Sequence, residues 1–192
     1  MATAGVTIPG VMAEKTLAEM FAELYTARHN TPAKVDTNQR IYELTEVNPA
    51  IPKAPIRLAT ERDMSFLPYW TEGFYQECGY APRVMDSNPQ TYRYHIKQGR
   101  LYIMEDGGTP VTMAKISRDL ETLCVIAFVY TPPYFRKKGY ATACVAAISQ
   151  LALNRGFTKC VLYTDLSNPT SNSIYQKIGY KPICDSLLVK FD

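Results

Sequence analysis

The sequence predicts a mixed α/β domain preceded by a short N-terminal segment, and three observations support this fold class. Short apolar runs bounded by turn residues alternate with segments whose apolar residues have helical spacing. The chain has 192 residues, enough to bury one core without disulfide or metal staples. Hydrophobic residues make up 46% and charged residues 20%, values typical of folded globular proteins, so wholesale disorder is excluded.

The chain divides at a connector, Asn48–Pro55, whose three prolines predict a stiff extended segment. Before it, apolar spacing predicts a helix over Glu14–Arg28 and a strand over Gln39–Val47. We therefore divide the chain into an N-terminal helix–strand segment, residues 1–53, and a main domain, residues 54–192. One helix and one strand bury little alone, so this segment is expected to pack on the main domain or on a second copy in a homodimer.

The first half of the main domain is predicted to alternate strands and helices. A strand at Ile56–Ala59 precedes a helix that Thr60 or Asp63 caps and that runs to about Gly73. Ser87-Asn88-Pro89 indicates the start of a second helix, which ends at Gln98-Gly99. Three strands follow, with a hairpin turn at 105–108 between the first two: 101–104, 111–116 and 123–131.

The second half contains the clearest helix, Gly139–Asn154, with apolar residues on one face and Gly156 just beyond its end. A buried strand is predicted at Lys159–Thr164. Asn168-Pro169 is typical of a helix start, and Gly179 ends that helix. The last strand is expected over Tyr180–Phe191.

Charge and composition exclude several classes of function. Lys and Arg total 21 against 18 Asp and Glu, a net charge of +3 with no long basic run, so nucleic acid is not expected as a partner. A membrane span needs about 18 consecutive apolar residues, and no stretch approaches that length. The N-terminus lacks a secretory signal pattern. The five cysteines include no CxxC pair, so we expect no metal site and reduced thiols in a cytoplasmic protein.

The segment Phe128–Thr142 carries the strongest functional pattern: a strand, a basic turn with glycine, and a helix start. A helix N-terminus presents unpaired N–H groups and the positive end of the helix dipole. Gly139 allows close approach of an anion, and three basic residues, Arg136, Lys137 and Lys138, add positive charge. The pattern favours a pyrophosphate site over an ordinary solvated loop. GxGxxG and GxxxxGK[ST] loops are absent, which excludes Rossmann and P-loop interpretations.

A second cluster lies on the helix predicted after Asn168. Helical spacing places Asn168, Asn172 and Tyr175 on one face. Two amides and a phenol on one face suit an extended polar ligand. The alternatives are that Asn168 only caps the helix and that Tyr175 belongs to the core.

Together the two segments resemble the GCN5-related N-acetyltransferase (GNAT) superfamily. Arg136-x-x-Gly139-x-Ala141 is similar to its Q/R-x-x-G-x-G/A pyrophosphate motif, and Asn168–Tyr180 is similar to its motif N-x-x-(A/S)-x-x-x-Y-x-K-x-G-(F/Y). Val129–Pro133 and Asn168–Asn172 are most similar to a bacterial branch of uncharacterised acetyltransferases. Members of this branch often carry a degenerate copy of the fold ahead of the active one, and residues 1–53 resemble the tail of such a copy.

The resemblance implies a mixed, mostly antiparallel sheet with helices on both faces and a central parallel strand pair that splays apart. The pair would be the strands at 123–131 and 159–164, and acetyl-CoA would bind between them as co-substrate. The backbone of Val129, Tyr130 and Thr131 would pair with the pantetheine arm, and one N–H would polarise the thioester carbonyl. The remaining cofactor-binding residues implied are Arg136, Lys137, Lys138, Gly139, Tyr140, Ala141 and Thr142 at the pyrophosphate, and Asn168, Ser171 and Asn172 at the pantetheine or phosphates.

The resemblance also implies catalytic roles. Tyr175 would act as general acid toward the departing thiolate, since a tyrosine pKa of about 10 and a thiol pKa of about 8.5 permit proton delivery. Some relatives carry a Glu base where this sequence has Val125, so Glu121 becomes the first candidate for the base, ahead of Glu105 and His95. The alternatives are that Glu121 is a solvated turn residue and that the site binds the neutral amine.

Aromatic residues gather in the two helices that the family places over the acceptor: Tyr69, Trp70, Phe74, Tyr75, Tyr80, Tyr92 and Tyr94. An aromatic pocket there would hold a cation or an apolar acyl group. The alternative is that they form a helical face packed on the sheet.

The sequence thus predicts a cytoplasmic N-acetyltransferase that moves an acetyl group from acetyl-CoA to a primary amine by direct attack in a ternary complex. The expected partner is a small-molecule amine or an amino group, with no nucleic acid and no membrane. One alternative is a non-catalytic acyl-CoA-binding or sensing module. Another is an interaction protein that self-associates through an apolar face on residues 11–47.

Overall fold

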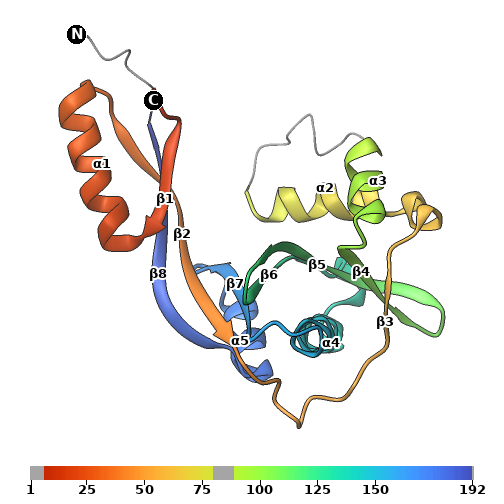
Figure 1. The fold of residues 1–192 in the computed structure, drawn as a ribbon. Helices are drawn as coiled ribbons and strands as arrows, with labels where there is room; N and C mark the ends of the chain where they lie inside the picture. Colours follow the sequence, from red (N-terminus) through yellow and green to blue (C-terminus); the bar gives the residue numbers. More distant parts are fainter. Residues whose placement is uncertain (1–6, 80–88, 192) are drawn as a thin grey trace. The chain divides into compact units, whose positions relative to one another are not determined.

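The structure of the protein is a computed structural model, and it describes residues 7–79 and 89–191. The described residues form two compact units (Figure 1). The first contains the residues up to Tyr42, Tyr163–Ser173 and the residues from Lys181 onward; the second contains Glu43–Leu162 and Ile174–Tyr180. The boundary proposed at residue 53 stays a prediction.

The first unit is a small sheet with one helix packed on it. Its strands, in hydrogen-bonded order, are β1 (Gly10–Glu14), β8 (Lys181–Phe191), β2 (Ala33–Leu44) and the end of β7 (Lys159–Asp165). β1 and β8 are antiparallel, from Gly10↔Lys190 to Glu14↔Ser186. Figure 1 shows these strands side by side with α1 (Lys15–His29) alongside. The predicted helix is confirmed as α1, whereas the predicted strand over Gln39–Val47 begins earlier, as β2. β1 was not predicted because its five residues carry no period of their own.

Helix α1 turns Ala18, Ala22 and Tyr25 inward and exposes its other large apolar residues. Ala18 and Ala22 pack against Leu187 and Val189 of β8. The opposite face exposes Leu17, Met20, Phe21 and Leu24. Small inward residues allow the helix to lie close to the strand.

The second unit holds most of the predicted main domain. Its elements are β3 (Ile56–Leu58), the 3₁₀ helix η1 (Glu61–Ser65), α2 (Leu67–Glu77), α3 (Pro89–Lys97), β4 (Leu101–Asp106), β5 (Thr109–Leu120), β6 (Leu123–Tyr130), the 3₁₀ helix η2 (Pro133–Phe135), α4 (Tyr140–Asn154), the start of β7 and the end of α5 (Pro169–Ile178). Its strand order is β7-β6-β5-β4-β3. β3 to β6 pair antiparallel, and β6 and β7 pair parallel. The mixed, mostly antiparallel sheet with one parallel pair is therefore confirmed.

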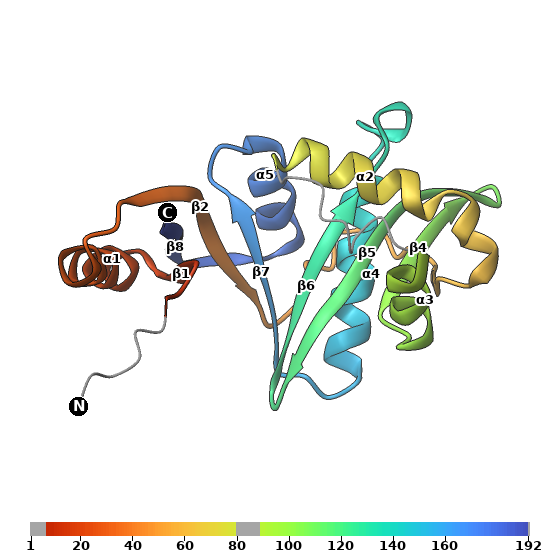
Figure 2. The same ribbon diagram turned by 90° about the horizontal axis from the view of Figure 1, so that it is seen from above.

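Helices cover both faces of this sheet. Figure 1 shows α2 and α3 on one face and α4 on the other, and Figure 2 shows α2 lying across β6, β5 and β4. Leu67 and Trp70 of α2 join Ile103, Met113 and Tyr130 in a buried apolar cluster. The core beneath α2 thus fixes the helix over the strands that carry the predicted site.

The single helix predicted from Thr60 to Gly73 is in fact two, η1 and α2. The Asp63 carboxylate accepts the backbone N–H of Thr60 at 2.7 Å, which caps η1. Phe66 then leaves helical geometry at φ −126°, and Pro68 stands in the first turn of α2. The break has a local cause, because Pro68 has no backbone N–H with which to continue the preceding helix and its ring would clash with the carbonyl four residues earlier. The predicted cap at Ser87 and Asn88 lies outside the described residues, and the helix after it is confirmed as α3.

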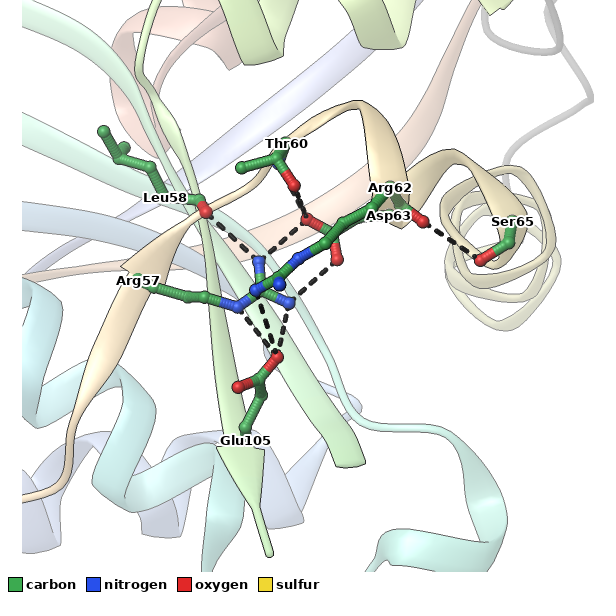
Figure 3. A network of polar contacts seen from close by, with 7 residues as sticks. All are labelled: Arg57, Leu58, Thr60, Arg62, Asp63, Ser65 and Glu105. Carbon is green, nitrogen blue, oxygen red and sulfur yellow. Dashed lines mark hydrogen bonds and ion pairs between the residues drawn. The ribbon is translucent and has the colours of Figure 1, made fainter. Parts of the chain in front are cut away.

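An ion-pair network joins β3, η1 and β4 (Figure 3). Arg57 donates to both oxygens of Asp63 at 2.8 Å and to Glu105 Oε1. Burial alone raises the pKa of Asp63, but the hydrogen bonds from Arg57 and from the Thr60 N–H outweigh it and hold that pKa below its usual value of 3.8. Arg57 of β3 therefore links η1 to β4 at this edge of the sheet.

No helix within residues 7–79 and 89–191 has the length and apolar character needed to cross a membrane.

Candidate active site

The edge of β6 is the first part of the site. Its parallel ladder with β7 runs from Leu123↔Lys159 to Val125↔Val161. β6 continues to Tyr130, paired on its other side with β5. Among the described residues of the second unit, no strand pairs with β6 beyond Val125 on the β7 side. Backbone groups of 126–130 on that edge can therefore pair with an extended ligand.

A bulge bends β6 just before its end. The register with β5 shifts between Met113 and Lys115, and the opposing residue Phe128 has φ 59°. Left-handed geometry is strained for a bulky residue and is held in place by its surroundings. A bulge re-aims the residues after it, here Val129, Tyr130 and Thr131, which the sequence assigned to the thioester and pantetheine.

Tyr130 is locked between α2 and the loop after β6. Its ring is buried, lies 6.5 Å from that of Trp70, and has the Arg136 guanidinium 5.8 Å from its centroid. Burial, followed by the charge of Glu77, raises the pKa of Tyr130, so its phenol stays protonated. Thr112 Oγ1 donates to the Tyr130 carbonyl at 2.9 Å. The end of β6 is therefore held rigidly from both sides.

Gly73 allows α2 to approach Tyr130. A Cβ at position 73 would lie 2.3 Å from Tyr130 Oη and 2.9 Å from Cζ. We expect Gly73→Ala to destabilise the protein by about 1–3 kcal/mol through overpacking, measured by urea unfolding. Adding Tyr130→Phe removes the nearest atom and should recover part of this loss. If Gly73→Ala lowered the free energy of unfolding equally in the presence and absence of the Tyr130 hydroxyl, the close contact between position 73 and Tyr130 Oη would be contradicted.

Arg136 contributes to the site differently from the expectation that its charge meets a phosphate. Its guanidinium binds both carboxylate oxygens of Glu77 at 2.6 Å and donates to the Thr131 carbonyl at 2.8 Å. Its positive charge is thus largely paired. Arg136 fastens the end of α2 to the loop, and the exposed Lys137 and Lys138 supply the positive charge there.

The turn before α4 has the geometry of an anion site. Lys137 and Gly139 both have left-handed backbone, with φ 62° and 81°. The first helical hydrogen bond runs from Ala143 N to Gly139 O, and no side chain from the described part of the chain caps α4. The N–H groups of Tyr140, Ala141 and Thr142 therefore precede the helical ladder. A Cβ built on Gly139 meets nothing within 4 Å, so the space in front of it is open.

Tyr140, the first residue of α4, contacts the β4–β5 hairpin. Its hydroxyl donates to Asp106 Oδ2. This bond to a carboxylate raises the pKa of Tyr140. The side chain of Tyr140 therefore anchors the start of α4 to the hairpin, and its backbone N–H remains one of the donors of the turn.

Tyr175 is buried on α5, in the same unit as β6 and α4. Its ring stands edge-on to Tyr180 at 6.0 Å, and its carbonyl accepts the Tyr180 N–H at 3.0 Å. Tyr180 is fixed by a 2.8 Å hydrogen bond to Ser149, and burial raises its pKa well above the usual value. Tyr175 is thus held against a rigid partner.

Three predicted ligand contacts, Asn168, Ser171 and Asn172, fall in the first unit. Asn168 Oδ1 accepts the Ser171 N–H at 3.0 Å, the capping role that the sequence left open. Asn172 donates to the Asp165 and Asn168 carbonyls and accepts from Tyr42 Oη at 2.9 Å. These amides hold the junction of β7 and α5. Their contact with a cofactor stays a prediction.

The candidates for the general base are widely separated. Glu121 is exposed in the turn before β6, and the eight residues of that strand separate it from Thr131 by about 25 Å. Glu121 thus lies at the opposite end of β6 from Thr131, and its role as the base stays a prediction. Glu105 is bound by Arg57. His95 lies near the β6 bulge, with its Nε2 3.1 Å from Lys115 Nζ and a cavity shared with Phe128.

The aromatic residues predicted to line an acceptor pocket lie in different surroundings, and their contact with an acceptor stays a prediction. Tyr75 and Tyr92 line that cavity, Trp70 joins the core, and Tyr69 and Tyr94 are exposed. Tyr80 lies outside the described residues. The other lining residues, Thr71 and Lys115 among them, were missed, because no local pattern marks residues that meet from separate elements.

All five cysteines are free thiols, and Cys124, Cys144 and Cys160 are buried. Burial raises the pKa of Cys144 to about 12. Within residues 7–79 and 89–191, no three His, Cys, Asp or Glu side chains form a group that could hold a metal ion.

The sequence comparison decides the family: residues 63–180 match the model of the Acetyltransferase (GNAT) family. The chain belongs to this family. The GNAT motifs noted in the sequence, at Arg136–Ala141 and Asn168–Tyr180, lie within the matched region. No curated protein sequence matches the chain.

Solved structures agree with the GNAT fold. A GNAT-family acetyltransferase from Colwellia psychrerythraea superposes with a TM-score of 0.66 at 14% identity, over 96% of this chain and 65% of that one. A GCN5-related N-acetyltransferase from Sphaerobacter thermophilus superposes with a TM-score of 0.66 at 16% identity, over 95% of this chain and 60% of that one. The chain thus spans less than two thirds of these two relatives. PaiA N-acetyltransferase from Thermoplasma acidophilum was solved in complex with coenzyme A. It superposes with a TM-score of 0.58 at 14% identity, over 73% of this chain and 100% of that one.

Proposed function

We propose that the protein is an N-acetyltransferase that moves an acetyl group from acetyl-CoA to a primary amine by direct attack in a ternary complex. The observation that carries the proposal is the turn before α4, in which left-handed Lys137 and Gly139 precede the free N–H groups of the first helical turn. Membership of the GNAT family supports acyl transfer. The coenzyme A complex of the Thermoplasma relative supports the choice of acyl donor.

The residues present fit coenzyme A. A pyrophosphate needs several N–H donors, positive charge and room. The backbone of 139–142 supplies donors, Lys137 and Lys138 supply charge, and the space before Gly139 is open. Among the residues that the structure describes, no strand of the second unit pairs with β6 beyond Val125 on the β7 side, and this edge suits the amide groups of a pantetheine arm. Acetyl-CoA, when bound, supplies an activated thioester.

The chain's own groups then have distinct tasks. A backbone N–H near Val129, re-aimed by the Phe128 bulge, donates to the carbonyl oxygen as negative charge develops on it. The neutral amine forms the new C–N bond as the C–S bond breaks, and the nitrogen releases its proton to solvent water. Tyr175 holds a proton for the departing sulfur, and a phenol pKa of about 10 is close enough to a thiol pKa of about 8.5 for this transfer.

We expect Tyr175→Phe to lower kcat by about 100-fold or more without changing coenzyme A affinity. Turnover is measured by thiol release with a panel of primary amines, and affinity by calorimetry. The matched control is Tyr180→Phe, which removes the buried bond to Ser149 and should cost about 1 kcal/mol of stability with turnover unchanged. Full activity of Tyr175→Phe would remove Tyr175 from the mechanism.

A non-catalytic acyl-CoA-binding module is the second candidate, favoured by the separation of Glu121 from Thr131 along β6 and by the ion pair that holds Glu105. This candidate requires coenzyme A binding with no thiol release for any amine. The free thiols further support a reducing, cytoplasmic location for either activity.

A further inference from the structure

Tyr130, the last residue of β6, and Thr131, the residue after it, are held by side chains from outside the strand. Thr112 of β5 donates its hydroxyl proton to the Tyr130 carbonyl at 2.9 Å. Arg136 Nε donates to the Thr131 carbonyl at 2.8 Å. Both of these carbonyls are therefore occupied by the protein itself, which leaves the backbone N–H groups at this point to a ligand.

The bond from Thr112 also indicates which way the Thr131 N–H points. A trans peptide is planar, with its C=O and its N–H on opposite sides. The Tyr130 carbonyl faces β5, because it accepts from Thr112 and because Tyr130 pairs with Met113 of that strand. The Thr131 N–H therefore faces away from β5, toward the edge that carries the proposed coenzyme A contacts.

The Thr131 N–H is a free donor at this edge. No backbone carbonyl within residues 7–79 and 89–191 accepts it. The next residue, Pro132, has no N–H to offer. An extended ligand whose amide carbonyl meets the Thr131 N–H would pair with it as a neighbouring strand does, and the pantetheine arm of coenzyme A carries such amides.

Thr112 also holds the side chain of Thr131. The two hydroxyl oxygens are 2.8 Å apart. A hydroxyl has one proton to donate, and Thr112 gives its own to the Tyr130 carbonyl, so Thr131 is the donor between the two. Thr112 is completely buried. Its single hydroxyl therefore fixes both the peptide before Thr131 and the Thr131 side chain.

We propose that Thr112 is a positioning residue for the acyl donor. Its hydroxyl fixes Thr131 so that the Thr131 N–H binds the pantetheine arm and the thioester comes to lie beside Val129. The inference rests on the proposed function, because it assigns a further residue to the same coenzyme A site. The bulge makes such support necessary: Phe128 has left-handed backbone at φ 59°, and strained backbone persists only where its surroundings hold it.

Two substitutions of Thr112 separate its hydroxyl from its shape. Thr112→Val keeps the shape and removes the hydroxyl, whereas Thr112→Ser keeps the hydroxyl and removes a buried methyl group. By calorimetry, Thr112→Val should bind coenzyme A about three- to tenfold more weakly, the usual effect of one hydrogen bond. Its affinity for 3′-phospho-ADP, which lacks the pantetheine arm, should be unchanged. Thr112→Ser should bind both ligands as the wild type does, and it would be the weaker binder if Thr112 only filled space.

Turnover provides a second readout, with Ser117→Ala as the matched control. Misplacement of the thioester should lower kcat for acetyl-CoA by about 10-fold in Thr112→Val. Ser117 of β5 donates to the Val125 carbonyl of β6 at 3.1 Å, the same kind of bond between the same strands. Val125, however, lies within the ladder with β7. Ser117→Ala should therefore leave kcat and both affinities unchanged.

Amide hydrogen exchange tests the Thr131 N–H in the wild-type protein, without any variant. Measured by NMR, this exchange should be slowed at least about tenfold by coenzyme A and should not be slowed by 3′-phospho-ADP, because only the first ligand supplies an acceptor at this position. Strong protection before any ligand is added, or none when coenzyme A is bound, would overturn the inference.

The remaining outcomes separate the inference from the proposed function. Wild-type affinity and kcat in Thr112→Val, or an equal loss of affinity for coenzyme A and 3′-phospho-ADP, would overturn the positioning role and leave the proposed function standing. Coenzyme A binding by the wild type without turnover of any amine would overturn acetyl transfer, and the affinity and exchange measurements would still decide the role of Thr112. Absence of coenzyme A binding would overturn both together.

Discussion

Gly139→Glu is expected to weaken coenzyme A binding by at least about 100-fold. The substituted side chain would project into the open space before α4, where the first N–H groups of the helix would hold the proposed pyrophosphate. Two like charges about 4 Å apart repel by about 4 kcal/mol at the effective dielectric of a protein surface, and about 1.4 kcal/mol corresponds to a tenfold change in affinity. Calorimetric titration with coenzyme A measures the loss.

Gly156→Glu is the matched control for this variant. Gly156 follows the other end of α4, has φ 100°, and a Cβ built on it also meets nothing within 4 Å. Both substitutions add one negative charge and place a side chain on left-handed backbone, at a cost of about 1–2 kcal/mol. Stability should therefore fall similarly in both variants. Equal coenzyme A affinity in the two variants would show that the turn before α4 is not the phosphate site.

The local parts of this site could be predicted from the sequence. Gly139 and the following helix are contiguous, so the local pattern alone predicted a glycine-containing turn followed by the unpaired N–H groups of a helix start. Helices α1 and α4 were likewise found because each repeats its apolar face over 15 residues. Strand β5 was predicted too short, since its last four residues, Ser117–Leu120, carry few apolar side chains.

The non-local parts could not be predicted. Arg136 was expected to bind phosphate, but its partner Glu77 lies on another helix, 59 residues away in the sequence. Asn172 was expected to face a ligand, but Tyr42, 130 residues earlier, takes its side-chain oxygen. The left-handed geometry of Phe128 has no sequence signal, because it arises from a register shift against β5. In each case the structure adds a contact that forms only on folding, while cofactor binding by Arg136 and Asn172 stays a prediction.

Arg57→Met is expected to lower the free energy of unfolding by about 3–5 kcal/mol at pH 7, the usual cost of removing one partner from a buried ion pair. Asp63 is 1% exposed, and Arg57 contacts both of its oxygens at 2.8 Å. Methionine keeps much of the packing volume but leaves a buried carboxylate without its counter-charge. Urea unfolding followed by the fluorescence of Trp70, the single tryptophan of the chain, measures the effect.

Arg93→Met is the control that distinguishes the cost of losing a buried ion pair from the cost of losing an exposed one. Arg93 pairs with Glu61 at 3.2 Å, on the same 3₁₀ helix as Asp63, but the two side chains are 46% and 63% exposed. Exposed pairs contribute about 0–1 kcal/mol, so this variant should unfold almost as the wild type does. A similar loss in both variants would mean that burial of Asp63 does not set the cost.

The cost of Arg57→Met should also depend on pH, with a sign fixed by Asp63. The pKa of Asp63 is lowered in the folded protein below its usual value of 3.8. The stabilisation is therefore fully present above pH 3.8 and is lost as the pH falls below that value toward the folded-state pKa. In Arg57→Met the carboxylate has lost its main counter-charge, so protonation in acid relieves the variant more than the wild type. The difference in unfolding free energy between the two proteins should hence narrow below pH 3.8, whereas a difference that is constant down to the acid transition would indicate lost packing rather than a lost charge interaction.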